Sequence, residues 1–154
     1  MLNKDEFLHH CKDGAPLWPI IIYAESVIKE HECFVSYRYN EYRSLYDSSD
    51  RYVRWFIGYL EKCIILKAED VVSDLFHEIG HMLQEPLKAG DSASIEGSCA
   101  QFKRENKAWD IGKNILRNCD LVNEAFLLAF NARKEHCRNE NKKYGDYLKN
   151  VLDV

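Results

Sequence analysis

A short apolar segment near the middle of the chain constrains the fold more than any other feature of the sequence. It runs from Leu75 to Gln84 and contains two histidines, His77 and His81, with Glu78 directly after the first. On an α-helix, residues four apart lie on one face, one turn above each other. The apolar neighbours predict that this helix is buried in a core, where an unpaired imidazole would be costly. The fold must therefore supply partners for these histidines.

The pentad His77-Glu78-Ile79-Gly80-His81 specifies a chemistry. Two imidazoles on one helix face can bind the same Zn²⁺, and a glutamate beside the first can act on a water at the metal. The alternative is that the two histidines are ordinary helix-surface residues and the pattern is accidental. We favour a zinc site, because His-Glu-x-x-His is rare by chance in a chain of this composition.

Length and charge limit the other possibilities. The chain has 154 residues, with 21 basic and 25 acidic side chains and a net charge of −4, so we expect one domain over residues 1–154. No dense basic stripe is present, which argues against nucleic acid as a partner. No apolar run approaches the ~20 residues that span a membrane, and the first residues do not resemble a signal peptide. We therefore expect a cytoplasmic protein.

Hydrophobic periodicity predicts an α+β domain, with helices around a small sheet of about three strands. The pentad lies on a helix that begins near Glu69, close to the middle of the chain. Helical patterns also cover residues 5–12, 19–28, 95–116, 121–136 and 142–152. Strand patterns cover residues 33–39, 52–57 and 62–67, and the polar residues 42–51 are typical of a loop. Pro86 and the Gly90-Asp91-Ser92 cluster are expected to follow the end of the pentad helix.

Gly80 lies inside the pentad helix, where glycine costs about 1 kcal/mol relative to alanine. A glycine at this position indicates that another backbone, or the sheet, approaches closely on that side.

A catalytic zinc site usually has three protein ligands, so a third must come from a separate element. Glu105 is the preferred candidate, because Ala108 and Gly112 on the same helical face are small and would draw it inward against another helix. Glu96 is the alternative. It lies closer to the pentad in the sequence, but it has no comparable small residues beside it that would draw it inward. His136 lies in a charged run that is typical of a solvated helix end.

Six cysteines are scattered along the chain without any Cys-x-x-Cys pair, so neither a zinc ribbon nor a redox motif is indicated. They are most simply buried small hydrophobic residues, although an even number also permits three disulfides. The six are Cys11, Cys33, Cys63, Cys99, Cys119 and Cys137.

The pentad followed by Glu105-Asn106-Lys107-Ala108 resembles the gluzincin type of zincin metallopeptidase, and most of all the small cytoplasmic ImmA/IrrE-like peptidases of phages and mobile elements. The resemblance covers roughly residues 60–116. It implies a zincin-like fold and a zinc peptidase that hydrolyses peptide bonds in a protein or peptide substrate. A strand over Cys63–Leu66 would then be the sheet edge that pairs with an extended substrate.

One position departs from that family, whose members commonly carry Asn or Asp after the alanine. Here the residue is Trp109, so support for the ligands must come from elsewhere, with Asp74 or Asp110 as candidates.

The mechanism that this reading implies uses His77, His81 and Glu105 as zinc ligands and Glu78 as the general base. Candidate donors to the oxyanion are Tyr59, Tyr144 and Tyr147.

Three rival interpretations remain. A zincin-like domain that no longer cleaves would bind a regulatory partner protein, but it would be expected to have lost Glu78 or a ligand. A purely structural zinc site would need four Cys or His ligands, for which the cysteines are wrongly spaced. A helical interaction protein without metal would carry the pentad by accident.

Overall fold

The structure is a computed structural model that describes residues 1–39, 43–59, 66–85 and 95–152, without the side chains of 95–101, 144–145 and 147–152. The described residues form an α+β domain with five α-helices and a mixed sheet of three strands, which confirms the predicted class. A short 3-10 helix, η1, joins the first two helices. The elements are α1 (Lys4–His10), η1 (Ala15–Leu17), α2 (Trp18–Glu30), β1 (Phe34–Tyr39), β2 (Leu45–Asp47), β3 (Tyr52–Gly58), α3 (Ala68–Met82), α4 (Ile95–Arg117) and α5 (Glu124–Leu152).

The sheet has β3 at its centre, with β1 parallel on one side and β2 antiparallel on the other. Along β3 the side chains alternate, and Val53, Trp55 and Ile57 are buried. This is the period-two pattern expected of a strand with one face against a core.

The loop predicted over residues 42–51 is wrong at its centre, because β2 lies there and pairs with the start of β3. The Asp47 carboxylate accepts hydrogen bonds from the backbone of Ser49 and Asp50, which closes a tight turn. The polar residues therefore form a hairpin instead of an open loop. Of the strand predicted over residues 62–67, only Leu66 and Lys67 are described, and neither is in a strand; the rest lies outside the described residues.

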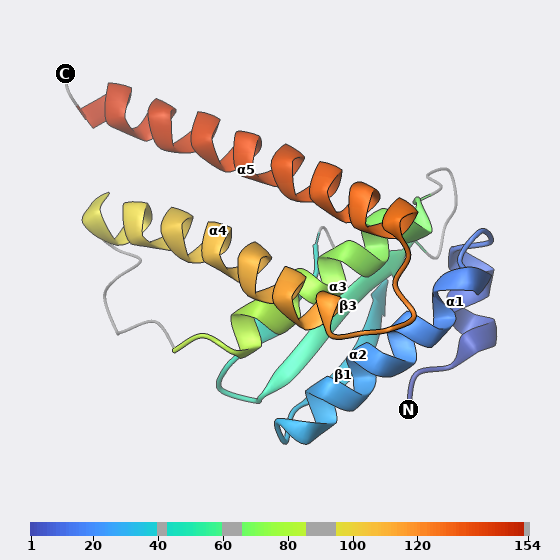
Figure 1. Ribbon diagram of the computed structural model, residues 1–154. Helices are drawn as coiled ribbons and strands as arrows, with labels where there is room; N and C mark the ends of the chain where they lie inside the picture. Colours follow the sequence, from blue (N-terminus) through green and yellow to red (C-terminus); the bar gives the residue numbers. More distant parts are fainter. Residues whose placement is uncertain (40–42, 60–65, 86–94, 153–154) are drawn as a thin grey trace.

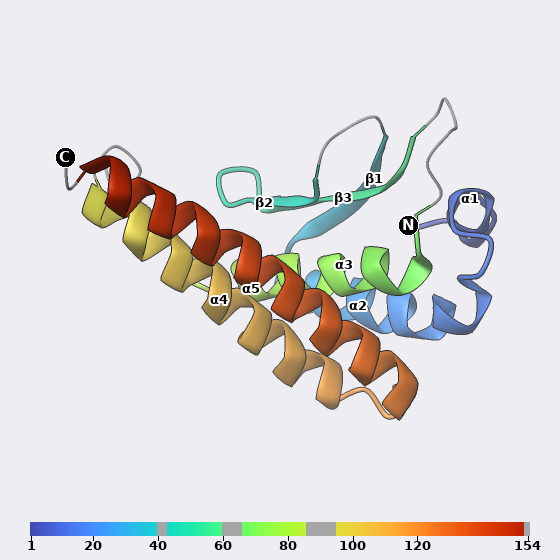
Figure 2. The same ribbon diagram turned by 90° about the horizontal axis from the view of Figure 1, so that it is seen from above.

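Helix α3 lies between the sheet and the pair α4–α5, as Figure 2 shows, and it also contacts α2. Val71, Val72 and Leu75 in its first half are buried in the core, and α3 contacts both β2 and β3. The Trp55 indole N–H donates a hydrogen bond of 2.8 Å to the Val71 carbonyl, which joins β3 to α3 inside the core.

Helices α4 and α5 lie side by side and antiparallel, and the end of α5 points away from α1 (Figure 1). The two separate helices predicted over 121–136 and 142–152 are one continuous helix, α5. Ion pairs to α4 support it, because Asp110 lies 2.8 Å from the Lys134 amine and 2.7 Å from the Arg138 guanidinium. The charged stretch around His136, which the sequence predicts to be a solvated helix end, is therefore part of the surface of α5 that contacts α4.

The cysteines with described side chains, Cys11, Cys33, Cys119 and Cys137, are all free, so the arrangement with three disulfides is wrong. The first three are buried, as expected for small hydrophobic residues. Within the described residues, no helix combines the length and the apolar character needed to cross a membrane.

Candidate metal centre

The pentad occupies the last turns of α3, on the helix that was predicted for it. The helix begins at Ala68. The acidic residues Glu69 and Asp70 lie in its first turn, where their negative charge interacts favourably with the helix dipole and stabilises the helix. The side chains of His77 and His81 are each 13 % exposed and that of Glu105 is 37 % exposed, so the site is mostly sheltered from solvent. Their rings lie 4.6 Å apart between centroids, as expected for neighbours one turn apart.

Helices α3 and α4 cross with their backbones almost in contact. A Cβ atom added to Gly80 would overlap the carbonyl oxygen of Ala108, and one added to Gly112 would overlap the carbonyl oxygen of Phe76. Two glycines, one from each helix, therefore create the crossing, and Ala108 is fully buried within it. This confirms the expectation that another backbone approaches Gly80.

The close crossing brings Glu105 to both histidines. One of its carboxylate oxygens, Oε2, lies 2.9 Å from Nε2 of His77 and 3.1 Å from Nε2 of His81. Atoms of all three side chains that could bind a metal lie within 4.8 Å of one another. Of the two glutamates considered for the third position, Glu105 is therefore beside the histidines, whereas the side chain of Glu96 lies outside the described residues.

The donor set fits a catalytic zinc ion. Two imidazole nitrogens and one carboxylate oxygen are the three-ligand combination of many zinc hydrolases, with a fourth position left for water. Among the described residues, Nε2 of His77 is buried and has no hydrogen-bond partner, because its contact with Glu105 lacks hydrogen-bond geometry. A buried nitrogen without a partner is costly, and a metal ion between the three side chains would satisfy it.

The charges of the site favour an ion pair when no metal is bound. Burial lowers the pKa of His77, but the carboxylates of Glu105 and Glu78 raise it to about 9. Burial raises the pKa of Glu105, but the two histidines lower it well below its usual range. At neutral pH the metal-free site therefore holds a protonated His77 against an ionised Glu105, and a metal ion would replace that proton.

Gln84 orients the ring of His81 through a hydrogen bond to Nδ1, the ring nitrogen that does not face Glu105. The Nδ1 atom of His81 lies 2.9 Å from the Gln84 side-chain oxygen, and the Gln84 amide nitrogen donates a hydrogen bond of 2.9 Å to the carbonyl of Arg104. Because an amide oxygen only accepts, Nδ1 of His81 carries the hydrogen that faces Gln84, which leaves Nε2, 3.1 Å from the Glu105 carboxylate, as the atom that could bind a metal. Sequence reasoning missed Gln84; its position three residues after His81 was the available signal.

Trp109 supports His77 by stacking on it. The two rings are nearly parallel, at 7°, with centroids 4.3 Å apart, and Trp109 is buried. The residue that departs from the family pattern therefore contacts a candidate ligand directly. The two acidic residues considered for this role have other partners: Asp74 pairs with Arg133, and Asp110 pairs with α5.

Glu78 is buried next to the cluster and is not one of its three members. Its Oε1 atom lies 3.5 Å from Nδ1 of His77, which is too long for a strong hydrogen bond. It is thus close enough to act at the cluster without occupying a ligand position.

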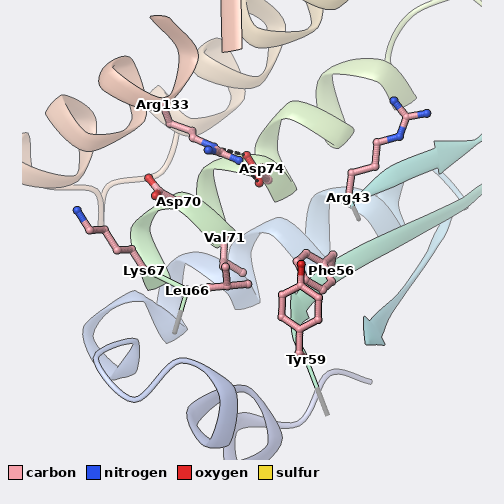
Figure 3. A pocket seen from close by; sticks show the side chains of 9 residues that line it. All are labelled: Arg43, Phe56, Tyr59, Leu66, Lys67, Asp70, Val71, Asp74 and Arg133. Carbon is pink, nitrogen blue, oxygen red and sulfur yellow. Dashed lines mark hydrogen bonds and ion pairs between the residues drawn. The ribbon is translucent and has the colours of Figure 1, made fainter. Parts of the chain in front are cut away.

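The remaining candidates lie elsewhere or cannot be placed. His136 is exposed on α5, outside the cluster. Tyr59 lines a cavity beside α3 (Figure 3). The side chains of Tyr144 and Tyr147 lie outside the described residues.

Comparison with protein families, with curated proteins and with solved structures gives no match to this chain.

Proposed function

We propose that the protein is a zinc-dependent metallopeptidase, with His77, His81 and Glu105 as the metal ligands and Glu78 as the general base. The observation that carries this proposal is the single carboxylate oxygen of Glu105 within 2.9 and 3.1 Å of the two facing histidine nitrogens. The buried Nε2 of His77 adds to it, since among the described residues this atom has the close contact with Glu105 but no hydrogen bond.

Zn²⁺ held by these ligands would lower the pKa of a water toward ~7 and polarise the carbonyl to be attacked. Glu78 accepts the proton of the attacking water and delivers it to the leaving nitrogen of the cleaved bond. Gln84 keeps His81 in the tautomer that can bind a metal, and Trp109 fixes the ring plane of His77. The three side chains that hold the metal are thus each positioned by a neighbour or by the helix crossing.

A peptide is the proposed substrate because the pentad and Glu105-x-x-Ala108 resemble the zincin peptidases. The substrate-pairing strand expected over Cys63–Leu66 lies outside the described residues, except for Leu66. The alternative is a catalytically silent binding module that acts on a regulatory partner protein, and turnover distinguishes it from an enzyme.

The test compares cleavage by wild-type protein and by Glu78→Gln. Both are loaded with zinc and incubated with a degenerate peptide library, and cleavage is followed by mass spectrometry. We expect wild-type protein to cleave the library and Glu78→Gln to lose at least about 100-fold of the rate while retaining zinc, since Glu78 is not a ligand.

The matched control is Glu69→Gln, which makes the same change at an exposed glutamate in the first turn of α3. It should cleave like the wild type. Equal activity of Glu78→Gln and wild type would contradict the mechanism, and no cleavage by wild-type protein with zinc bound would favour the binding module.

A further inference from the structure

The two edges of the sheet differ in how they are protected. At one edge β2 has only three residues, and a short edge strand is one way in which proteins prevent unwanted pairing. At the other edge β1 has six residues and contains neither the proline nor the lysine that commonly blocks an edge. Of the residues that the structure describes, none forms a strand on the outer side of β1. The edge that can accept a further strand is therefore β1.

The backbone groups of alternate residues in β1 point away from β3. The Phe34 N–H donates a hydrogen bond of 2.9 Å to the Arg51 carbonyl, just before β3. Successive peptide groups of a strand point to opposite sides, so Val35 and Tyr37 present their N–H and C=O groups at the outer edge. The Tyr37 carbonyl accepts a hydrogen bond of 2.9 Å from the Arg38 guanidinium. A carbonyl has two lone pairs, so it can also accept a bond from a neighbouring strand.

The side chains of β1 alternate between the two faces of the sheet. Val35 and Tyr37 lie on the core face, in register with two buried residues of β3. Phe34, Ser36 and Arg38 lie on the opposite face. Phe34 is 64 % exposed, although it belongs to the sheet. The edge therefore offers unused backbone groups beside an exposed aromatic ring.

This strand is complementary to itself when a second copy runs antiparallel to it, with Ser36 opposite Ser36. The backbone groups of Val35 then bond to those of Tyr37 of the second copy. On the core face this pairs a β-branched side chain with an aromatic one, which is a favourable cross-strand pair. On the other face the ring of Phe34 lies opposite Arg38 of the second copy, where a guanidinium can interact favourably with it. No like charges lie opposite each other in this register.

We propose that the protein forms a symmetric dimer in which the β1 strands of two copies pair antiparallel around Ser36 and join the two sheets into one. The pairing is closed by a two-fold axis, so the joined sheet keeps only the short β2 strands as its edges. The inference goes beyond the proposed function and does not depend on it, because it uses no residue of the metal centre.

Sedimentation velocity of the purified full chain, under reducing conditions and over roughly 2–400 µM, measures the association. We expect a reversible equilibrium between monomer and dimer with a dissociation constant on the order of tens of micromolar, because one pair of strands is a small interface. Ser36→Lys places like charges opposite each other at the two-fold axis and should raise the dissociation constant at least about tenfold. The matched control, Ser36→Ala, adds no charge and should associate like the wild type.

A cysteine at the axis tests the register. In the proposed pairing, residue 36 and its counterpart form a pair without hydrogen bonds between them, with Cα atoms about 4.5 Å apart, which a disulfide can span. Ser36→Cys should therefore form a covalent dimer in oxidised glutathione. Ser26→Cys, at an exposed serine of α2, and the wild type measure the background cross-linking.

The outcomes separate this inference from the proposed function. A protein that stays monomeric over this range, or a dimer that Ser36→Lys does not weaken and Ser36→Cys does not cross-link, would overturn the inference. Circular dichroism checks the fold of each variant, and the cross-link decides if Ser36→Lys does not fold. Zinc binding and cleavage by a monomer would leave the proposed function intact, whereas a dimer with these properties and no metal would support the inference and overturn only the peptidase.

Discussion

The two halves of α3 are held in place in different ways. The first half buries large side chains, among them Val71, Val72 and Leu75, and is tied to β3 by the hydrogen bond from Trp55 to the Val71 carbonyl. The second half approaches α4 at Gly80, where an added Cβ would overlap the backbone of Ala108. Both halves bury large side chains, Phe76 and Ile79 among them in the second half, but only the second half also depends on the absence of a side chain, at Gly80.

This difference explains where the chemistry lies. A core built from large side chains adjusts to modest changes in volume, whereas two backbones in contact leave no room to adjust. The site needs a carboxylate oxygen near 3 Å from two imidazoles on a neighbouring helix, as Glu105 provides. The backbone contact at Gly80 holds α3 and α4 at a fixed separation, and such a site requires this because its ligands come from both helices.

The largest effect should come from adding one methyl group at the crossing. Gly80→Ala should lower the free energy of unfolding by about 3 kcal/mol, because the overlap with Ala108 outweighs the ~1 kcal/mol gain in helix propensity. Separation of the helices should also move Glu105 from the histidines and weaken zinc binding. Urea unfolding and a competitive zinc titration measure the two effects.

The matched change in the first half is Val72→Ala, which removes volume from the fully buried face. It should cost about 2 kcal/mol of stability and leave zinc affinity within about threefold. Unchanged zinc affinity in Gly80→Ala, or an equal loss in both variants, would show that the two halves of α3 do not differ in this way.

A smaller effect concerns pH in the zinc-free protein. The pKa of His77 is raised to about 9, above the ~6.5 of an unfolded histidine, although burial alone would lower it. Its stabilisation is thus complete below about pH 6.5 and is lost as pH rises through about 9. The free energy of unfolding should fall by on the order of 2 kcal/mol over that range, measured with a chelator present.

Glu105→Gln is the control for this pH dependence, because it removes the charge that holds the proton on His77. The decline with rising pH should be clearly shallower in this variant. An identical slope in both proteins would mean that other groups cause the decline and that the His77–Glu105 pair is not formed.

The smallest effect should come from the support behind His81. Gln84→Ala removes the hydrogen bond to Nδ1 and should lower zinc affinity about tenfold. Gln84→Glu keeps an acceptor for His81 and loses only the donor to the Arg104 carbonyl, so it should lose less affinity. Equal losses in the two variants would show that the contact with His81 does not matter.

Much of the site could be predicted from the sequence because it depends on helical periodicity. The spacing of His77 and His81, and the small residues Ala108 and Gly112 one and two turns after Glu105, are regularities of single helices. Their joint consequence, a close crossing of two helices, follows from the space that small residues leave.

The features that were missed depend on contacts between elements. The stacking of Trp109 on His77 and the bonding of Gln84 to both His81 and Arg104 need the relative position of α3 and α4. The short strand β2 has only three residues, and its pairing with β3 has no counterpart in local hydrophobicity.

The continuity of α5 was missed for a related reason. A charged run has the same composition whether it faces water or a neighbouring helix, and here Lys134 and Arg138 face Asp110 of α4. Sequence patterns along one element do not report such partners.

The most direct test is the metal content of the purified, untagged protein by mass spectrometry, with Glu105→Gln and Glu96→Gln measured beside it. The account predicts about one zinc ion per chain in wild-type protein and in Glu96→Gln, and a loss of more than about 100-fold in affinity in Glu105→Gln. A wild-type protein that holds no metal, even after incubation with zinc at neutral pH, would contradict the central claim.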